Sequence, residues 1–287
     1  MPAAILDSPS PHPLASGLRM ACFDIDGTIV DQRHQVSERT AECFGLLKAK
    51  NVRIGIASGR PLFGVHSLLR DYGFDGPCSL FAGALLVDPK DQTTLYECCF
   101  SPEQARAIVS VCSEHSLYYE LYTKDAFYID VAEQTYTDIH EEYLSARPRR
   151  LASMSDVLSE TLYKGLIIIP REEQVPVTQA LSQALPDCSI GCSPGAAHPE
   201  IMFVNITSAR RSRRDTFAAL IAHLGIEAEQ VLAFGDGETD IEFLGSAGIG
   251  VAMGQSVARV KDAAGYVTGS VQEDGVALAI HHIFGVP

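Results

Sequence analysis

The chain has 287 residues, 46% hydrophobic and 20% charged, which is the composition of a globular protein with one large or two moderate domains. Its 22 basic and 36 acidic residues give a net charge of -14, which argues against a general nucleic-acid or anionic-membrane surface. No stretch approaches the roughly 18 apolar residues of a membrane span, and the eight cysteines contain no Cys-x-x-Cys pair, so we expect reduced thiols in a cytoplasmic protein.

Residues 1–18 contain four prolines and lack the basic start and apolar core of a secretion signal, so we interpret them as a flexible leader. The apolar run Met20-Ala21-Cys22-Phe23 then predicts a buried strand. Directly after it, Asp24-Ile25-Asp26-Gly27-Thr28 places two carboxylates two residues apart, with a glycine that allows a tight turn. One carboxylate at a strand end can attack phosphorus or hold a cation, and a second can move a proton. A strand-ending turn with a solvated acid pair is the alternative.

The next elements alternate between strand and helix. Ser37 is expected to cap a helix, and the apolar run from Val52 to Ala57 predicts a second strand that ends at Ser58-Gly59-Arg60-Pro61. After a further helix, a third strand from Ser79 to Ala82 ends at Gly83. This alternation predicts a parallel sheet covered by helices on both faces.

From about residue 85 the pattern becomes that of an α+β domain. Strands are expected at residues 117–122, 126–131, 163–169 and 201–204, and helices near 102–116, 134–145 and 172–185. We interpret residues 85–198 as a domain inserted into a core formed by residues 19–84 and 199–287.

In the second part of the core, Ser212 to Leu224 predicts a helix that Gly225 closes as a C-cap. A strand at residues 231–234 then runs into Gly235-Asp236-Gly237-Glu238-Thr239-Asp240. Further strands are expected at residues 248–253 and 265–268, before a last helix near 273–284.

Four predicted strands therefore end at a polar residue or a glycine, namely Asp24, Ser58, Gly83 and Asp236. In a parallel sheet these ends share one edge, so the pairs Asp24/Asp26 and Asp236/Asp240 are expected to converge there. Converging carboxylates repel one another unless a cation lies among them, and an all-oxygen set of ligands suits Mg²⁺. An anionic substrate would need positive charge, which arginines around the start of a helix can supply: Arg210, Arg211, Arg213 and Arg214. The alternative is that these four arginines form a solvated helix face.

With these motifs in order, the chain resembles the haloacid-dehalogenase-like superfamily and, within it, the Cof-type branch of Mg²⁺-dependent sugar-phosphate phosphatases. The resemblance covers about residues 19–285, and the inserted block matches the family's α+β cap. It implies a Rossmann-like doubly wound parallel-sheet core and the hydrolysis of small phosphorylated metabolites through an aspartyl-phosphate intermediate. Two alternatives remain open: a phosphomutase or phosphotransferase that uses the same intermediate, and a catalytically impaired phosphometabolite-binding protein.

The resemblance also implies roles for individual residues. Asp24 becomes the nucleophile, and Asp26 first protonates the leaving oxygen and then activates water. Mg²⁺ would be held by Asp24, the backbone carbonyl of Asp26, and Asp236. Ser58 and Arg213 would bind the phosphoryl group. Thr28, at the end of the first acid motif, and Gly59, next to Ser58, would also contribute to phosphate binding. Asp240 and Thr239 would lie next to the metal ligands and orient them without binding the ion.

At three places the chain departs from the family pattern. The family's catalytic lysine falls on Arg213, which keeps the charge but is longer and planar. Thr239 occupies a position that is usually asparagine, and Ala82-Gly83-Ala84 stands where Asn-Gly-Ala is usual. A different start of the helix would bring one of the neighbouring arginines to the phosphate instead of Arg213.

Overall fold

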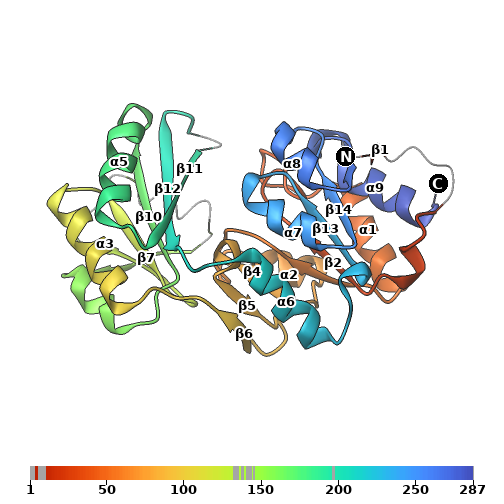
Figure 1. Ribbon diagram of the computed structural model, residues 1–287, viewed down its shortest axis with the longest axis horizontal. Helices are drawn as coiled ribbons and strands as arrows, with labels where there is room; N and C mark the ends of the chain where they lie inside the picture. Colours follow the sequence, from red (N-terminus) through yellow and green to blue (C-terminus); the bar gives the residue numbers. More distant parts are fainter. Residues whose placement is uncertain are drawn as a thin grey trace. The chain divides into compact units, whose positions relative to one another are not determined.

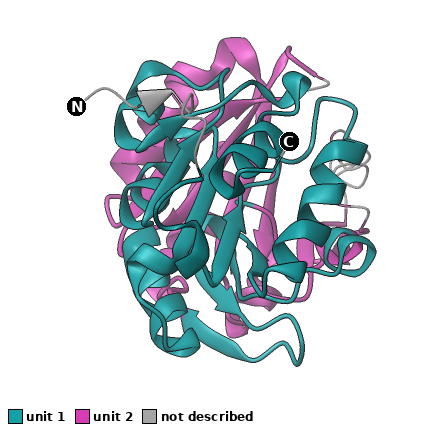
Figure 2. Cartoon of the chain, turned by 90° about the vertical axis from the view of Figure 1, so that its right-hand side faces the viewer, with its two compact units in different colours: residues 1–59, 68–96, 212–287 teal, residues 60–67, 97–211 magenta. Residues whose placement is uncertain are grey.

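The computed structural model describes residues 4–5, 11–131, 136, 139, 144, 146–195 and 198–286. The chain folds into two compact units, coloured separately in Figure 2. Unit 1 comprises residues 1–59, 68–96 and 212–287, and unit 2 comprises residues 60–67 and 97–211. Within the described ranges, no helix is both long enough and apolar enough to cross a membrane.

Unit 1 is built on a six-stranded sheet in the order β1-β15-β14-β13-β2-β3, in which every neighbouring pair is parallel. Its strands are β1 (Ala4–Ile5), β2 (Met20–Phe23), β3 (Arg53–Ile56), β13 (Val231–Gly235), β14 (Ile249–Ala252) and β15 (Tyr266–Val267). A three-stranded sheet continues from β3 through a bridge between Ala57 and Ser79, and consists of β4 (Cys78–Leu80), β5 (Leu85–Val87) and β6 (Thr94–Glu97). The predicted parallel core sheet is thus confirmed.

Helices cover both faces of this sheet (Figure 1), because successive side chains of a strand point to opposite sides. On one face, Cys22 packs in a cluster with Phe217 and Phe243. On the other, Phe23 meets the edge of Phe44 with ring centroids 5.4 Å apart. The helices concerned are α1 (Glu38–Ala49), α2 (His66–Tyr72), α6 (Arg213–Leu224), α7 (Ile241–Ser246), α8 (Ala258–Ala263) and α9 (Gly275–Phe284). The unit is therefore doubly wound, as predicted.

Unit 2 is an α+β domain around a second six-stranded sheet in the order β11-β12-β10-β7-β8-β9. Its strands are β7 (Tyr119–Tyr122), β8 (Phe127–Asp130), β9 (Arg149–Leu151), β10 (Lys164–Pro170), β11 (Cys188–Pro194) and β12 (Ile201–Ser208). The helices α3 (Pro102–Glu114) and α5 (Gln174–Ala184) pack on this sheet through one apolar cluster. The helix expected near 134–145 lies largely outside the described residues.

The units differ in extent from the expected boundaries at 85 and 198. β5 and β6 belong with β4, so unit 1 continues to residue 96. β12 pairs with β10 and β11, so unit 2 continues to residue 211. Part of the expected leader is also structured, because β1 pairs with β15 and Leu18 is buried. A two-residue edge strand has too little sequence pattern to be recognised.

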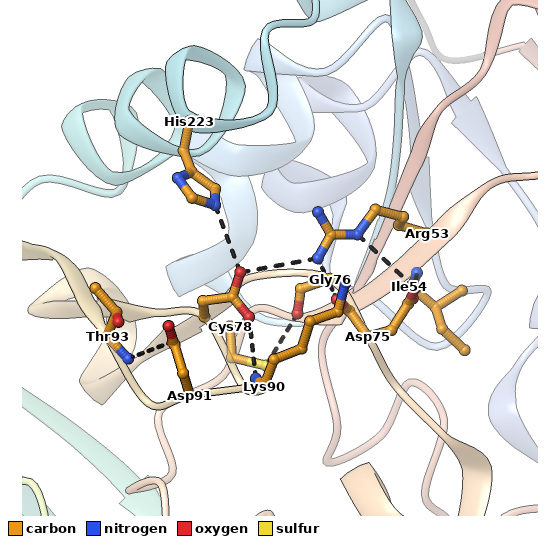
Figure 3. Close-up of polar contacts among 10 residues, drawn as sticks. Arg53, Ile54, Asp75, Gly76, Cys78, Lys90, Asp91, Thr93 and His223 are labelled. Atoms are coloured by element: carbon orange, nitrogen blue, oxygen red, sulfur yellow. Dashed lines mark hydrogen bonds and ion pairs between the residues drawn. The ribbon is translucent and has the colours of Figure 1, made fainter.

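The helix α6 is anchored at both ends. At its start, the Ser212 side chain accepts a hydrogen bond from the third helical N–H. At its end, Gly225 adopts the left-handed conformation with φ 64°, as predicted for a C-cap. In its last turn, His223 Nε2 lies 3.5 Å from Asp88 Oδ2, and Arg53 Nη2 lies 4.0 Å from the same oxygen. Figure 3 shows this polar network around Arg53 and His223. The Ser212 cap defines Arg213 as the first residue of α6, and the network contacts the last turn of the helix.

Candidate active site

The loops of the candidate site extend the hydrogen-bond ladder of the sheet beyond the strand ends. β2 lies between β13 and β3, and the Asp24 N–H donates to the Phe234 carbonyl at 3.0 Å. The Ser58 N–H donates to the Ser79 carbonyl at 2.8 Å. Because these strands are parallel, Asp24, Ser58 and Asp236 lie at the same edge of the sheet.

Three carboxylates meet at this edge. One oxygen each of Asp24, Asp236 and Asp240 lies within 4.8 Å of the others. Asp24 is only 9% exposed and Asp240 only 3%. The Oδ2 atom of Asp240 accepts hydrogen bonds from the backbone N–H groups of Asp236, at 3.2 Å, and of Gly237, at 3.0 Å.

Burial and mutual repulsion shift the protonation of this cluster. Burial raises the pKa of Asp24 well above its usual range, and the charges of Asp240, Asp236 and Asp26 add to the rise, while Arg213 opposes it. Burial, followed by the charge of Asp240, raises the pKa of Asp236 to about 6. Burial also raises the pKa of Asp240, although the positive charge of the Arg213 guanidinium partly lowers it again. A cation placed among these carboxylates would therefore favour their ionised forms.

Arg213 is the first residue of α6 and is 1% exposed. Its Nη1 atom lies 3.0 Å from Asp240 Oδ1 and donates to the Ala57 carbonyl at 3.3 Å. Its Nε and Nη2 atoms are buried donors without a hydrogen-bond partner among the described residues. Arg214 is exposed, whereas Arg210 and Arg211 belong to unit 2. Of the two among these four arginines that belong to unit 1, Arg213 is the one beside the carboxylates.

The loop after β2 packs tightly against Asp236. Gly27 has φ +84°, and a Cβ atom there would lie 2.3 Å from Asp236 Oδ2, so a larger residue would strain the backbone and displace that carboxylate. Asp26 is exposed and Thr28 is buried. The loop therefore presents one carboxylate to solvent close to the buried cluster, which suits proton exchange.

The other predicted residues have different surroundings. Ser58 is 2% exposed at the end of β3. Nothing lies within 4 Å of a Cβ atom built on Gly59, so sterics do not require glycine at that position. Thr239 is exposed in the 3₁₀ helix η6 (Glu238–Asp240), whereas Asp240, at the end of the same helix, is buried.

A strained turn, the 3₁₀ helix η2 (Phe81–Gly83), links Ser58 to Arg213. Phe81 and Ala82 have positive φ values of 50° and 55°. The Ala82 N–H donates to the Ser58 carbonyl at 2.9 Å, and a Cβ atom on Gly83 would lie 2.8 Å from Arg213 Cγ. The turn thus contacts both residues that are expected to bind phosphate, Ser58 and Arg213.

Two residues at the site were not predicted from the sequence. Glu242 Oε2 accepts a hydrogen bond from the Arg213 N–H at 3.0 Å, which places an acid at the N-terminus of α6. Gln255 Nε2 donates to the Gly27 carbonyl at 2.5 Å and lies 3.5 Å from Asp236 Oδ2. Glu242 follows the predicted acid motif by two residues, which was a usable signal, but nothing in the sequence pattern marks Gln255.

Comparisons with known proteins agree with this geometry. A family model described as haloacid dehalogenase-like hydrolase matches residues 21–280. A putative phosphatase of Haemophilus influenzae is 28% identical over 264 residues, which cover 91% of this chain and 96% of that protein. A solved haloacid dehalogenase-like hydrolase from Bacteroides thetaiotaomicron has a TM-score of 0.83 at 24% identity, over 93% of this chain and 100% of that one. A solved sugar phosphatase of HAD subclass IIB has a TM-score of 0.77 at 28% identity, over 92% and 98% of the two chains. The family match spans both acid motifs and the block between them, and the chain therefore belongs to the haloacid dehalogenase-like hydrolases.

Proposed function

We propose that the protein is a phosphatase that hydrolyses small phosphorylated metabolites, sugar phosphates above all, with Asp24 as the nucleophile. The observation that carries the proposal is the burial of Asp24 beside two more carboxylates and the free donors of Arg213. The printed names of the Haemophilus relative and of the subclass IIB structure, a phosphatase and a sugar phosphatase, support the same reaction.

The carboxylate cluster fits a divalent cation. Its ligand atoms are all oxygens, as Mg²⁺ prefers, and burial, with repulsion from the neighbouring carboxylates added to it, raises the pKa of Asp24 and of Asp236. Asp24, Asp236 and the backbone carbonyl of Asp26 would hold the ion, while Asp240 already accepts two backbone N–H groups and pairs with Arg213. When bound, the ion neutralises charge on the transferring phosphoryl group.

In the proposed reaction, a carboxylate oxygen of Asp24 attacks phosphorus, and the bond from phosphorus to the leaving oxygen breaks. Asp26 donates its proton to that oxygen and so becomes a base. Water then attacks the phosphorus of the aspartyl phosphate and gives a proton to Asp26, and the bond between phosphorus and the Asp24 oxygen breaks to release phosphate. Ser58 and the free donors of Arg213 hold the phosphoryl oxygens in both steps, because this transfer depends mainly on positioning and charge.

Asp24→Asn tests the proposal, since an amide cannot form the aspartyl phosphate. We expect no phosphate release from an aryl phosphate in the presence of Mg²⁺, with an unchanged melting profile. Asp71→Asn is the matched control, because Asp71 is an exposed aspartate on α2 and should leave turnover unchanged. Turnover by Asp24→Asn at the wild-type rate would contradict the nucleophile assignment.

Product analysis of the wild-type protein with a panel of hexose monophosphates separates the alternatives. Free phosphate supports the phosphatase. Isomerised sugar phosphate without free phosphate would indicate a mutase, and tight binding without turnover would indicate a binding protein.

A further inference from the structure

The amide of Gln255 is held at both ends, although the residue is exposed. Its Oε1 atom accepts a hydrogen bond from the Val271 N–H at 3.2 Å. Its Nε2 atom donates to the Gly27 carbonyl at 2.5 Å and lies 3.5 Å from Asp236 Oδ2. An N–H must face the amide oxygen, and a carbonyl must face the amide nitrogen, so these partners allow only one orientation of the side chain.

The loop that carries Gln255 is itself rigid. The Gly254 N–H donates to the Gly269 carbonyl at 2.9 Å, and Lys261 Nζ donates to the Gly254 carbonyl at 2.6 Å. A Cβ atom on Gly254 would lie 2.7 Å from the backbone nitrogen of Ser270, so the two backbone segments are in direct contact. These contacts hold the backbone from which the Gln255 side chain extends.

The groups that Gln255 reaches are parts of the carboxylate cluster. Gly27 follows Asp26 directly, its N–H donates to the Val30 carbonyl at 3.0 Å, and its backbone is pressed against the Asp236 carboxylate. The Gly27 N–H shares one planar peptide with the Asp26 carbonyl, so its bond to Val30 orients that carbonyl, and Gln255 holds the next peptide, on the other side of the Gly27 Cα atom. The Gly27 carbonyl and the Asp236 carboxylate are both acceptors, and without a shared donor between them they would repel each other.

We propose that Gln255 is a positioning residue of the divalent-cation site, which holds the Asp26-Gly27 backbone and the Asp236 carboxylate in the arrangement that binds Mg²⁺. The inference rests on the proposed function only in its choice of Mg²⁺ as the ion. Hydrogen-bond partners behind metal ligands typically account for about 10- to 100-fold in metal affinity. Gln255 acts in this way from a loop far along the chain.

The test is the dissociation constant of the full-length protein for Mg²⁺ alone, measured by calorimetry on wild type and on Gln255→Met. Methionine has a similar length but no N–H to donate. We expect an approximately 10-fold or greater loss of Mg²⁺ affinity, while the melting temperature in a chelator stays that of the wild type. Gln272→Met is the matched control, because Gln272 is exposed in the neighbouring turn, the 3₁₀ helix η7 (Val271–Glu273), and should bind Mg²⁺ normally.

An Mg²⁺ affinity of Gln255→Met within about twofold of the wild type would overturn the inference. So would a lowered melting temperature in chelator that accounts for the whole loss, because Gln255 would then act on stability and not on the ion. Gln255→Ala repeats the test with a different side chain and should show the same loss. If wild type binds Mg²⁺ but releases no phosphate from any substrate, the proposed function fails, while the affinity ratio still decides the role of Gln255.

Discussion

Replacing Arg213 by alanine should cost both stability and activity. The Arg213 side chain is 1% exposed and its partner Asp240 4%, so the substitution leaves a buried carboxylate without its cation. Breaking such a pair from one side costs about 3–5 kcal/mol. We expect the lower end of this range, because Asp240 keeps its two backbone hydrogen bonds. The free Nε and Nη2 donors would no longer reach the transition state, which should lower kcat by about 10²- to 10³-fold.

Urea unfolding in a chelator measures the stability term, and phosphate release at saturating Mg²⁺ measures kcat. Arg214→Ala is the matched control, since Arg214 is the next residue on the same helix but is exposed, and both quantities should stay at wild-type values. Wild-type kcat for Arg213→Ala would refute the reasoning, because the buried donors would then have no part in the transfer.

Three further predictions concern the loops and the carboxylates. Gly27→Ala should weaken Mg²⁺ binding by about 10-fold or more in calorimetry, since its Cβ would meet the Asp236 carboxylate, whereas Gly45→Ala, with nothing within 4 Å, should not. Ala82→Gly should raise the free energy of urea unfolding by about 0.5 kcal/mol, because it relieves a left-handed alanine; a decrease would show that the turn is not strained. The pKa of Asp236 is about 6 in the folded protein, above the roughly 3.9 of an unfolded aspartate, so the folded state binds more protons and stability falls as pH rises through this interval. The metal-free wild type should therefore lose more stability than Asp236→Asn between pH 4 and about 6, and saturating Mg²⁺ should restore it; equal slopes for the two proteins would contradict the shift.

The residues of the site that could be predicted from the sequence are those that directly follow a recognisable strand. A buried strand followed by an acid or a serine is visible as an apolar run with a polar end, and parallel pairing then brings Asp24, Ser58 and Asp236 to one edge. The C-cap of α6 was also predictable, because glycine readily adopts the left-handed conformation that Gly225 has.

The rest depends on contacts between residues far apart in the chain. Gln255 and Gly27 are 228 residues apart, and no periodicity in either segment relates them. Unit 1 extends beyond the expected boundary at residue 85 for a similar reason, since only the pairing of β5 and β6 with β4 assigns them to unit 1. Which of four adjacent arginines is buried depended on the exact start of α6, a boundary that sequence patterns define poorly.

The structure changes the weight of the three departures from the family pattern. Thr239 is exposed, and Ala82 meets Ser58 through its backbone N–H, which every residue except proline can supply. Arg213 alone alters a charged group beside the carboxylates, so the possibility of a catalytically impaired binding protein depends mainly on this residue. Arg213→Lys decides the question, because one compact ammonium cannot both pair with Asp240 and reproduce the Nε and Nη2 donors of the planar fork. A site adapted to arginine should lose about 10-fold in kcat with lysine, and a gain in kcat would show that Arg213 impairs a site built for lysine.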